Sequence, residues 1–594
     1  MSSWLYINIQ IKRAEGVLLL TYAKKNNYTA ADALNDALVN AGVSYIFANT
    51  GTDYPPIIES WAKYDVLGLP KPEIIICPHE MVALSAAQGY AQVTGQAQAV
   101  FVHVDVGTQN LGGSVHNVYR CRVPAFILAG VSPFTLEGEL KGTRNAPIQF
   151  LQNVHDQASI VREYTKWYYE VRTGKNIQQL VYRGLQIAHS DPQGPVYLMA
   201  AREVLEEEGR DIEAEMTKWG PIAPIGLAAE ALNDLCEALL AAENPVIITS
   251  YLGRNPDSVA QLVSLCERLA VPVIEVGAGY MNFPADHPLH LGHEPADFLQ
   301  EADFILIIDS NLPWIPAQNK PNPKAKIYYL DIDPLKEATP LWYIPADKFF
   351  KANSYAALLQ INKRLQQAKV AEERIAKRFK RLQAAHEQLW AEIKAKEQPK
   401  EVLTPEFIVG TLRDVVGDET IILNETTSYA PIVERHFARN KPGTWFMSGG
   451  SALGWFGGAA IGVKLACPEK RVVALCGDGT YIFSVPSATY WVAHKYKTPF
   501  LTVIFNNQGW GAAQMAVKQE HPDGYAVKND KFWTSISPAA DLGAIAQAAG
   551  NALALTVSEP AQLKPALLAG LQAIDEGRSA VLNLLLPPAS RQKI

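Results

Sequence analysis

Two short polar motifs follow apolar runs in the last third of the chain. Residues 477–480 (Gly-Asp-Gly-Thr) come directly after the run 471–476, and residues 506–507 (Asn-Asn) come directly after the run 499–505. Both runs have the composition of buried parallel strands. Residues 485–496 between them fit a helical crossover, so the segment is predicted to form one β-α-β unit.

Such a unit delivers the side chains of Asp478 and Asn507 to the same edge of a sheet, where open α/β sheets bind ligands. A carboxylate and an amide oxygen that leave room for water and phosphate oxygens are the ligands that Mg²⁺ prefers. The backbone N–H groups of Gly479 and Thr480 can hold a diphosphate beside the ion. The pattern therefore predicts a site for a metal-bound diphosphate.

This pattern resembles the diphosphate–metal motif of thiamine-diphosphate (ThDP) enzymes of the acetolactate synthase, 2-oxo-acid decarboxylase and 2-hydroxyacyl-CoA lyase superfamily. The resemblance implies that ThDP binds around Gly477, and that Asp478, Asn507 and the carbonyl of Gly509 coordinate Mg²⁺. The two side-chain ligands are slightly farther apart along the sequence than in many members of this superfamily. The extra length falls in residues 481–486, before the helix, where an insertion need not move either ligand.

A second part of the resemblance is residues 78–91 (Pro-His-Glu…Gly-Tyr-Ala), where an acid follows a strand and opens an Ala-rich helix. It implies that Glu80 is the catalytic carboxylate that contacts the cofactor's pyrimidine ring and activates it. The plain alternative is a helix-start glutamate favoured by the helix dipole. Because the family binds the two ends of the cofactor on different domains at a dimer interface, the resemblance also implies a homodimer or homotetramer.

Two more segments resemble parts of the family's cofactor site. Residues 448–454 match the segment that wedges the cofactor into a bent shape, which places Leu453 at the wedge and gives the carbonyl of Ser451 a contact with the 4′-amino group. Thr427 and Ser428 fall where relatives place diphosphate-binding side chains. Core packing for Leu453, and helix capping for Thr427 and Ser428, are the alternatives.

The substrate side is less specific. By alignment, His103 occupies the position of a catalytic histidine in decarboxylases, and an imidazole that titrates near neutral pH suits proton transfer. A hydrogen-bonded core histidine is the alternative. Gln109 is a candidate catalytic contact, Gln152 is a candidate contact to a substrate carbonyl or carboxylate, and Trp510 can shape the pocket. Residues 49–53 lack the proline of the relatives' pocket loop, so they identify no substrate.

The elements around these motifs predict an α/β fold with three doubly wound parallel-sheet domains. The expected boundaries are an N-terminal extension (1–28, with a short strand at 5–11), a pyrimidine-binding domain (29–204), a central domain (220–365), a charged helical linker (366–403), a diphosphate-binding domain (404–587) and a C-terminal tail (588–594).

Composition narrows the class of protein. A net charge of −7 argues against nucleic acid as a partner, and no run reaches the length of a membrane span. Six scattered cysteines without Cys-x-x-Cys spacing indicate reduced core thiols. We therefore expect a cytoplasmic protein that acts on small molecules and has neither nucleic-acid nor membrane partners.

The leading function is a ThDP- and Mg²⁺-dependent carboligase or lyase, acetolactate-synthase-like, that makes or cleaves a C–C bond next to a carbonyl of a 2-oxo acid or 2-hydroxyacyl compound. Its substrates would be a 2-oxo acid, an aldehyde or an acyl-CoA. Three alternatives stay open: a 2-hydroxyacyl-CoA lyase or oxalyl-CoA-type decarboxylase, for which Arg591 and Lys593 are compatible with CoA; a simple 2-oxo-acid decarboxylase; and a flavin-dependent enzyme of the pyruvate oxidase type. FAD or ADP in the central domain is expected for some of these.

Overall fold

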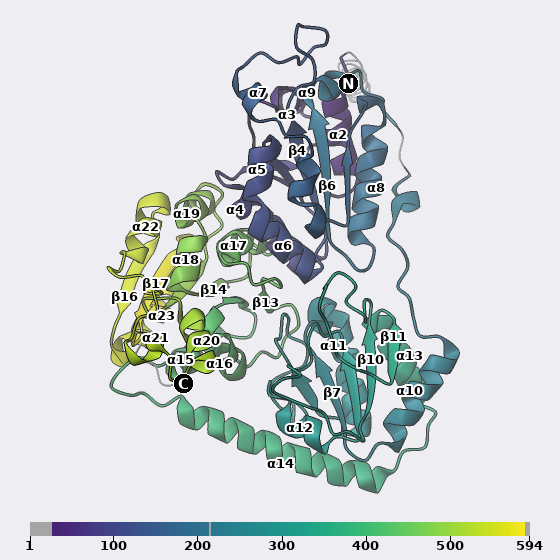
Figure 1. Ribbon diagram of the computed structural model, residues 1–594, viewed down its shortest axis with the longest axis vertical. Coiled ribbons are helices and arrows are strands. Elements are labelled where there is room, and N and C mark those ends of the chain that lie inside the picture. Colours follow the sequence, from purple (N-terminus) through teal and green to yellow (C-terminus); the bar gives the residue numbers. More distant parts are fainter. Residues whose placement is uncertain (1–26, 213–214, 589–594) are drawn as a thin grey trace, which may run out of the picture. The chain divides into compact units, whose positions relative to one another are not determined.

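The computed structural model describes residues 27–212 and 215–588. The chain divides into two compact units that meet between Ile222 and Ala223. The first unit contains one sheet and the second contains two, and every pair of neighbouring strands in all three sheets is parallel (Figure 1). The predicted fold class, with three parallel-sheet α/β domains, is confirmed. The strand expected at residues 5–11 and the side chains of Arg591 and Lys593 lie outside the described residues.

The sheet of the first unit has the strand order β2-β1-β3-β4-β6-β5. Its order reverses between β1 and β3, whose last residues, Asn49 and Val102, are register partners. Strand β3 is buried along its whole length, as expected for a sheet covered by helices on both faces. The strands are β1 (Tyr45–Asn49), β2 (Glu73–Ile76), β3 (Ala99–Val102), β4 (Ala125–Val131), β5 (Trp167–Glu170) and β6 (Pro195–Ala201), and the helices are α2 (Ala30–Asn40), α3 (Pro55–Leu67), α4 (Glu80–Thr94), α5 (Val104–Asn110), α6 (Gly112–Cys121), α7 (Ile148–Leu151), α8 (Ile177–His189) and α9 (Arg202–Glu206).

The second unit begins with a five-stranded sheet in the order β11-β10-β9-β7-β8. All of β7 and β9 is buried, which matches their unbroken apolar sequences. The strands are β7 (Pro245–Thr249), β8 (Val273–Glu275), β9 (Phe304–Ile308), β10 (Lys326–Asp331) and β11 (Lys348–Lys351), and the helices are α10 (Ala229–Ala241), α11 (Pro256–Leu269), α12 (Ala296–Glu301) and α13 (Ser354–Leu365).

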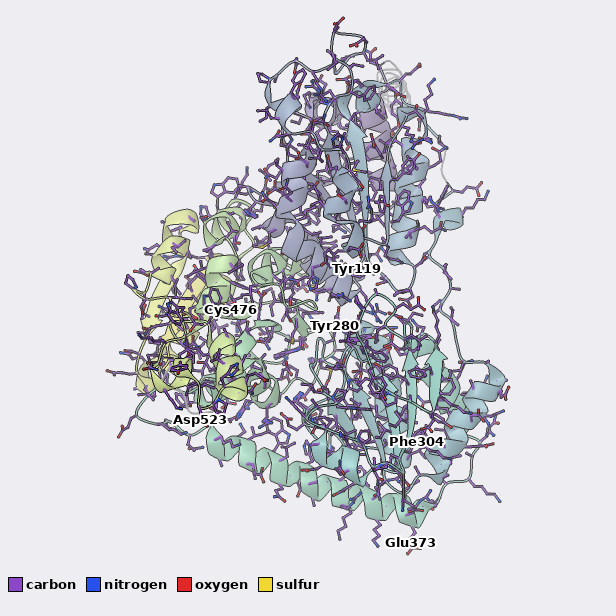
Figure 2. The ribbon with its side chains drawn as sticks, viewed as in Figure 1. Tyr119, Tyr280, Phe304, Glu373, Cys476 and Asp523 are labelled. Carbon is purple, nitrogen blue, oxygen red and sulfur yellow. The ribbon has the colours of Figure 1, made fainter. Side chains whose placement is uncertain are left out.

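The third sheet has the order β13-β12-β14-β15-β17-β16, which reverses between β12 and β14. Cys476, labelled in Figure 2, lies in β14 and pairs with Glu425 at the end of β12. The strands are β12 (Ile421–Glu425), β13 (Trp445–Met447), β14 (Val472–Gly477), β15 (Leu501–Asn506), β16 (Leu553–Val557) and β17 (Ala580–Leu585), and the helices are α15 (Pro405–Val416), α16 (Ala430–His436), α17 (Trp455–Ala466), α18 (Asp478–Phe483), α19 (Pro486–Lys495), α20 (Gly511–Glu520), α21 (Tyr525–Lys528), α22 (Leu542–Gly550) and α23 (Pro560–Asp575).

The charged linker contains one long helix, α14 (Glu372–Lys396), as Figure 1 shows. One face of this helix is buried, and on that face Arg378 donates hydrogen bonds to the carbonyls of Ala242, Glu243 and Leu269. These carbonyls lie at or just beyond the ends of α10 and α11. The guanidinium therefore satisfies acceptors that those helices leave free.

Three further features concern the motif at 477–480, the cysteines and the search for membrane-spanning helices. The sequence predicted one crossover helix at 485–496, but Asp478 also opens a short helix, α18, before the crossover helix α19. All six cysteines lie among the described residues and are free thiols, five of them buried. Within residues 27–212 and 215–588, no helix is both long and apolar enough to cross a membrane.

Candidate active site

A cavity of about 290 Å³ lies at the carboxyl ends of β12, β14 and β15, next to the reversal of strand order. Open parallel sheets bind ligands at such a reversal. Nearly all residues predicted for the cofactor in this domain line it: Thr427, Ser428, Leu453, Gly477, Asp478, Gly479, Thr480, Asn507 and Gly509. Ser451 is not among the lining residues; it is exposed, with φ of +61°.

Two buried oxygen atoms at this cavity have no hydrogen-bond partner among the described residues: Asp478 Oδ2 and Asn507 Oδ1. Asn507 Nδ2 donates to the Tyr429 hydroxyl at 3.1 Å, which orients the amide. Burial raises the pKa of Asp478 to about 6, although backbone N–H groups at Gly479 and Gln508 act in the opposite direction. A divalent cation would satisfy both oxygens and favour the carboxylate form, so the residues fit Mg²⁺.

The glycines of the motif allow the backbone to pack closely around the cavity. A Cβ atom on Gly479 would lie 2.2 Å from the Trp510 ring, and one on Gly511 would lie 2.9 Å from Ser428 Oγ. Trp510 therefore covers the backbone of Gly479 and lines the same cavity. A side chain at position 479 would require this ring to move.

The segment that carries Leu453 is held by Glu425. The Glu425 carboxyl group accepts hydrogen bonds from the backbone N–H groups of Trp455 and Phe456, at 3.3 and 2.9 Å, in the first turn of α17. Gly454, which precedes α17, has φ of +94°, and a Cβ there would lie 2.6 Å from the carbonyl oxygen of Phe483. Both contacts fix the approach of Leu453 to the cavity.

Glu80 belongs to the first unit and is the first residue of α4, as predicted for a helix-start acid. It is only 4% exposed. Its Oε1 accepts from Asn49 Nδ2 at 2.9 Å, and its Oε2 accepts from Asn110 Nδ2 at 3.0 Å. A Cβ on Gly107 would lie 3.1 Å from Glu80 Oε1, so a glycine keeps the carboxylate uncrowded. The buried acid is held by neutral donors and forms no ion pair among the residues that the structure describes.

His103 lies between β3 and α5 and is held at both ring nitrogens. Its Nδ1 is 2.5 Å from Asp53 Oδ1, and its Nε2 is 2.9 Å from Gln152 Oε1. Burial lowers the pKa of His103, but the hydrogen bond and the charge of Asp53 outweigh it, so the net pKa is raised. Asp53 fits because Gly130 has no side chain: a Cβ there would lie 1.5 Å from Asp53 Oδ2.

Sequence reasoning missed the roles of Asp53, Asn49 and Asn110. Both Asn49 and Asp53 lie in the loop that was set aside for lacking a proline, and no local signal joined Asp53 to a histidine 50 positions away. Gln152, a candidate substrate contact, lies within hydrogen-bond distance of His103. Gln109 lies on α5 and is exposed.

Three segments of the chain match models of known protein families. Residues 28–160, 232–339 and 425–584 match models of the N-terminal TPP binding domain, the central domain and the C-terminal TPP binding domain of thiamine pyrophosphate enzymes.

Over 585 residues, 94% of each chain, the sequence is 24% identical to the acetolactate synthase isozyme 3 large subunit of Escherichia coli (strain K12). It is 23% identical to 2-hydroxyacyl-CoA lyase 2 of Danio rerio, over 93% of this chain and 91% of that protein. The fold is similar to that of a thiamine diphosphate-dependent 4-hydroxybenzoylformate decarboxylase from Rhodococcus jostii RHA1, with a TM-score of 0.77, 20% identity and coverage of 94% of this chain and 99% of that one.

Proposed function

Because the chain belongs to the thiamine-diphosphate-dependent enzymes of the acetolactate synthase, decarboxylase and lyase superfamily, we propose that it makes or cleaves a C–C bond next to a carbonyl group, with Mg²⁺ as the second cofactor. The substrate would be a 2-oxo acid or a 2-hydroxyacyl compound. The relatives include an acetolactate synthase, a benzoylformate decarboxylase and a 2-hydroxyacyl-CoA lyase.

The observation that carries this proposal is the pair of unsatisfied buried oxygens, Asp478 Oδ2 and Asn507 Oδ1, at one cavity. These oxygens and the Gly509 carbonyl would hold Mg²⁺. The backbone of Gly477, Gly479 and Thr480 would hold the diphosphate. When bound, the cofactor supplies a carbon nucleophile that attacks a carbonyl and then stores the electron pair released by bond cleavage.

Two side chains of the first unit would manage protons. Glu80 would contact the pyrimidine ring and share a proton with it, and Asn49 and Asn110 keep both of its oxygens in place. His103 would give a proton to, or take one from, the reacting group. Asp53 would act as its positioning residue, because it holds the ring and favours the protonated form.

A simple 2-oxo-acid decarboxylase is the second candidate. The paired contacts of His103 favour it, because an imidazolium fixed on one side by Asp53 and on the other by Gln152 is prepared to donate a proton. Protonation ends the reaction at an aldehyde, whereas a carboligase must keep that proton away until a second carbonyl arrives. The products formed from aliphatic and aromatic 2-oxo acids, read by mass spectrometry, distinguish these outcomes.

Cofactor binding tests the proposal directly. ThDP titrated into the full chain with Mg²⁺ should bind and release heat, and Asp478→Ala should weaken this binding by more than about a hundredfold because a metal ligand is lost. Asp523→Ala, a matched change at an exposed aspartate of the same domain, should have no effect (Figure 2). Equal affinity in the native chain and Asp478→Ala would contradict the proposed metal site.

Two further points follow from the resemblance to the family. A homodimer or homotetramer is proposed and can be checked by light scattering on the purified chain. A visible flavin spectrum of the purified protein would favour the oxidase alternative, and its absence after reconstitution with FAD would disfavour it.

A further inference from the structure

A second cluster of ligand-type side chains lies in the central domain, at the end of β8. Glu275 is the last residue of this strand, and His290 and His293 come from the segment that follows it. One ligand atom from each of the three residues lies within 4.8 Å of the others. Glu275 is 5% exposed and His290 is 3% exposed.

The hydrogen bonds around the cluster orient it and leave it incomplete. Glu275 Oε1 accepts from the backbone and side-chain N–H groups of Asn282, both at 2.9 Å. His293 Nδ1 lies 3.0 Å from the carbonyl oxygen of Glu275, which can only accept, so the proton is on Nδ1 and the lone pair is on Nε2. His290 Nε2 lies 2.9 Å from Glu275 Oε2, while its Nδ1 is buried and has no partner among the described residues. A buried ring nitrogen without a partner costs free energy that a bound ion would recover.

A fourth candidate ligand, the carboxyl group of Glu434, is close to the cluster. Glu434, on α16, lines a cavity of about 30 Å³ together with Glu275, His290 and His293. This cavity has about the volume of one water molecule. A neighbouring cavity of about 200 Å³, lined by the two histidines, Glu434 and residues of α14, offers a route of entry.

We propose that Glu275, His290 and His293 bind a divalent transition metal ion, with Zn²⁺ the ion that the donors suit best. Two imidazoles and a carboxylate are a common zinc donor set, and Mg²⁺ would prefer oxygen ligands alone. The Glu275 carbonyl accepts from His293 Nδ1, and metal-bound histidines commonly donate their other ring N–H to such a carbonyl, which fixes the ring. Glu434 is the available fourth ligand.

The place of this site in the fold indicates a structural role. Helix α16, which carries Glu434, begins immediately after residues 427–429. These residues line the cavity at the carboxyl ends of β12, β14 and β15. Arg435 on the same helix pairs with Glu294 of the central domain at 3.0 Å. A metal bound to Glu275 and Glu434 would connect the central sheet to the helix that follows the cofactor-binding segment.

The test is metal binding by the untagged full chain, with ThDP and Mg²⁺ present in excess so that the other metal site is filled. Elemental analysis after Zn²⁺ loading and dialysis should give about one zinc per chain, and Co²⁺ loading should give the visible absorption of a low-symmetry, nitrogen-ligated ion. His293→Gln and Glu275→Gln should each lower Zn²⁺ affinity by about tenfold or more, measured against a chromophoric chelator. His287→Gln is the matched control, because this nearby histidine contacts Glu267 outside the cluster.

Three results of these experiments decide the zinc proposal. A native chain that retains no zinc, or that binds Co²⁺ without visible bands, overturns the proposal even if the variants fail to fold. Equal zinc retention by native and His293→Gln chains also overturns it. Asp478→Ala should keep the zinc while losing ThDP, so a failure of this site and a failure of the proposed cofactor site give different results.

Discussion

Replacing Asp53 by Asn tests whether this buried carboxylate controls the charge of His103. The two side chains meet at 2.5 Å, and Asp53 is only 3% exposed. Asn has nearly the same shape and can still accept a hydrogen bond from Nδ1, but it carries no charge. The burial of His103, which lowers its pKa, would then be opposed only by weaker contacts such as Gln152. We expect the pKa of His103 to fall in Asp53→Asn.

The size of the effect follows from the kind of bond that is lost. A hydrogen bond to a charged group contributes about 1.5–3 kcal/mol. At about 1.4 kcal/mol per factor of ten, the proton affinity of His103 should fall by roughly ten- to a hundredfold. Gln152→Ala removes a neutral acceptor, worth about 0.5–1.5 kcal/mol, and should have a smaller effect in the same direction.

The assay needs no substrate. Diethyl pyrocarbonate acylates the neutral imidazole, so the rate of modification at His103, followed by peptide mass spectrometry against pH, reports its protonation. In the native chain the midpoint should lie above the ordinary histidine pKa of about 6.5 and should move to lower pH in Asp53→Asn. Exposed His155, in the same digest, serves as the internal reference and should not move.

The sign also predicts stability. Because Asp53 raises the pKa of His103, the stabilisation that this pair provides is complete below pH 6.5 or so and is lost as the pH rises through the folded-state value. The native chain should therefore exceed Asp53→Asn in stability most at acidic pH. An unchanged His103 midpoint in Asp53→Asn would refute the reasoning.

Three further variants test other parts of the structure. Glu80→Gln should lower turnover by about 10²- to 10⁴-fold, because the side chain at position 80 can no longer transfer a proton. The melting temperature should change little, because glutamine keeps one acceptor for the flanking amides. A near-native kcat would exclude the assigned role. Gly479→Ala should displace Trp510, cost about 1–3 kcal/mol of stability and weaken ThDP binding, and adding Trp510→Ala should recover part of the loss, which calorimetry with ThDP can measure. Glu397→Gln should destabilise the chain by about 2 kcal/mol at neutral pH after allowance for solvent screening. Burial raises the pKa of Glu397, but hydrogen bonds from Arg413 and His436 outweigh burial and lower this pKa to about 2. The difference in unfolding free energy between the native chain and Glu397→Gln should shrink as the pH falls from about 4.5 toward 2. Urea unfolding at several pH values can measure it, and a constant difference would contradict the pairing.

The cofactor side of the site could be predicted because its signals are local in sequence. Asp478 and Asn507 each follow a buried apolar strand, and parallel strands that are neighbours bring their carboxyl ends together. The positions of strand ends, helix starts and glycines in the sequence therefore predicted most of the residues that line the cavity. The sequence did not indicate the short helix α18, because Gly477 and Gly479 are residues typical of turns.

The contacts of His103 could not be predicted because packing creates them. Asp53 reaches the imidazole only where Gly130 of β4 leaves space, and this requires the register of three strands. Packing also creates the contact between Glu275 and His290, because His290 lies beside Val273 of β8. Neither pair has a characteristic spacing along the chain.

Helix α14 limits how this protein can be recombined with its relatives. A chimera that takes residues 223–365 from another member would bring the ends of α10 and α11 without the guanidinium of Arg378 that bonds to their carbonyls. One that also takes residues 366–397 would separate Glu397 from Arg413 of α15, whose side chains meet at 2.7 and 2.8 Å. Successful crossover points should therefore lie near residue 222 at one side and beyond α15 at the other, so that the connector travels with both of its attachments.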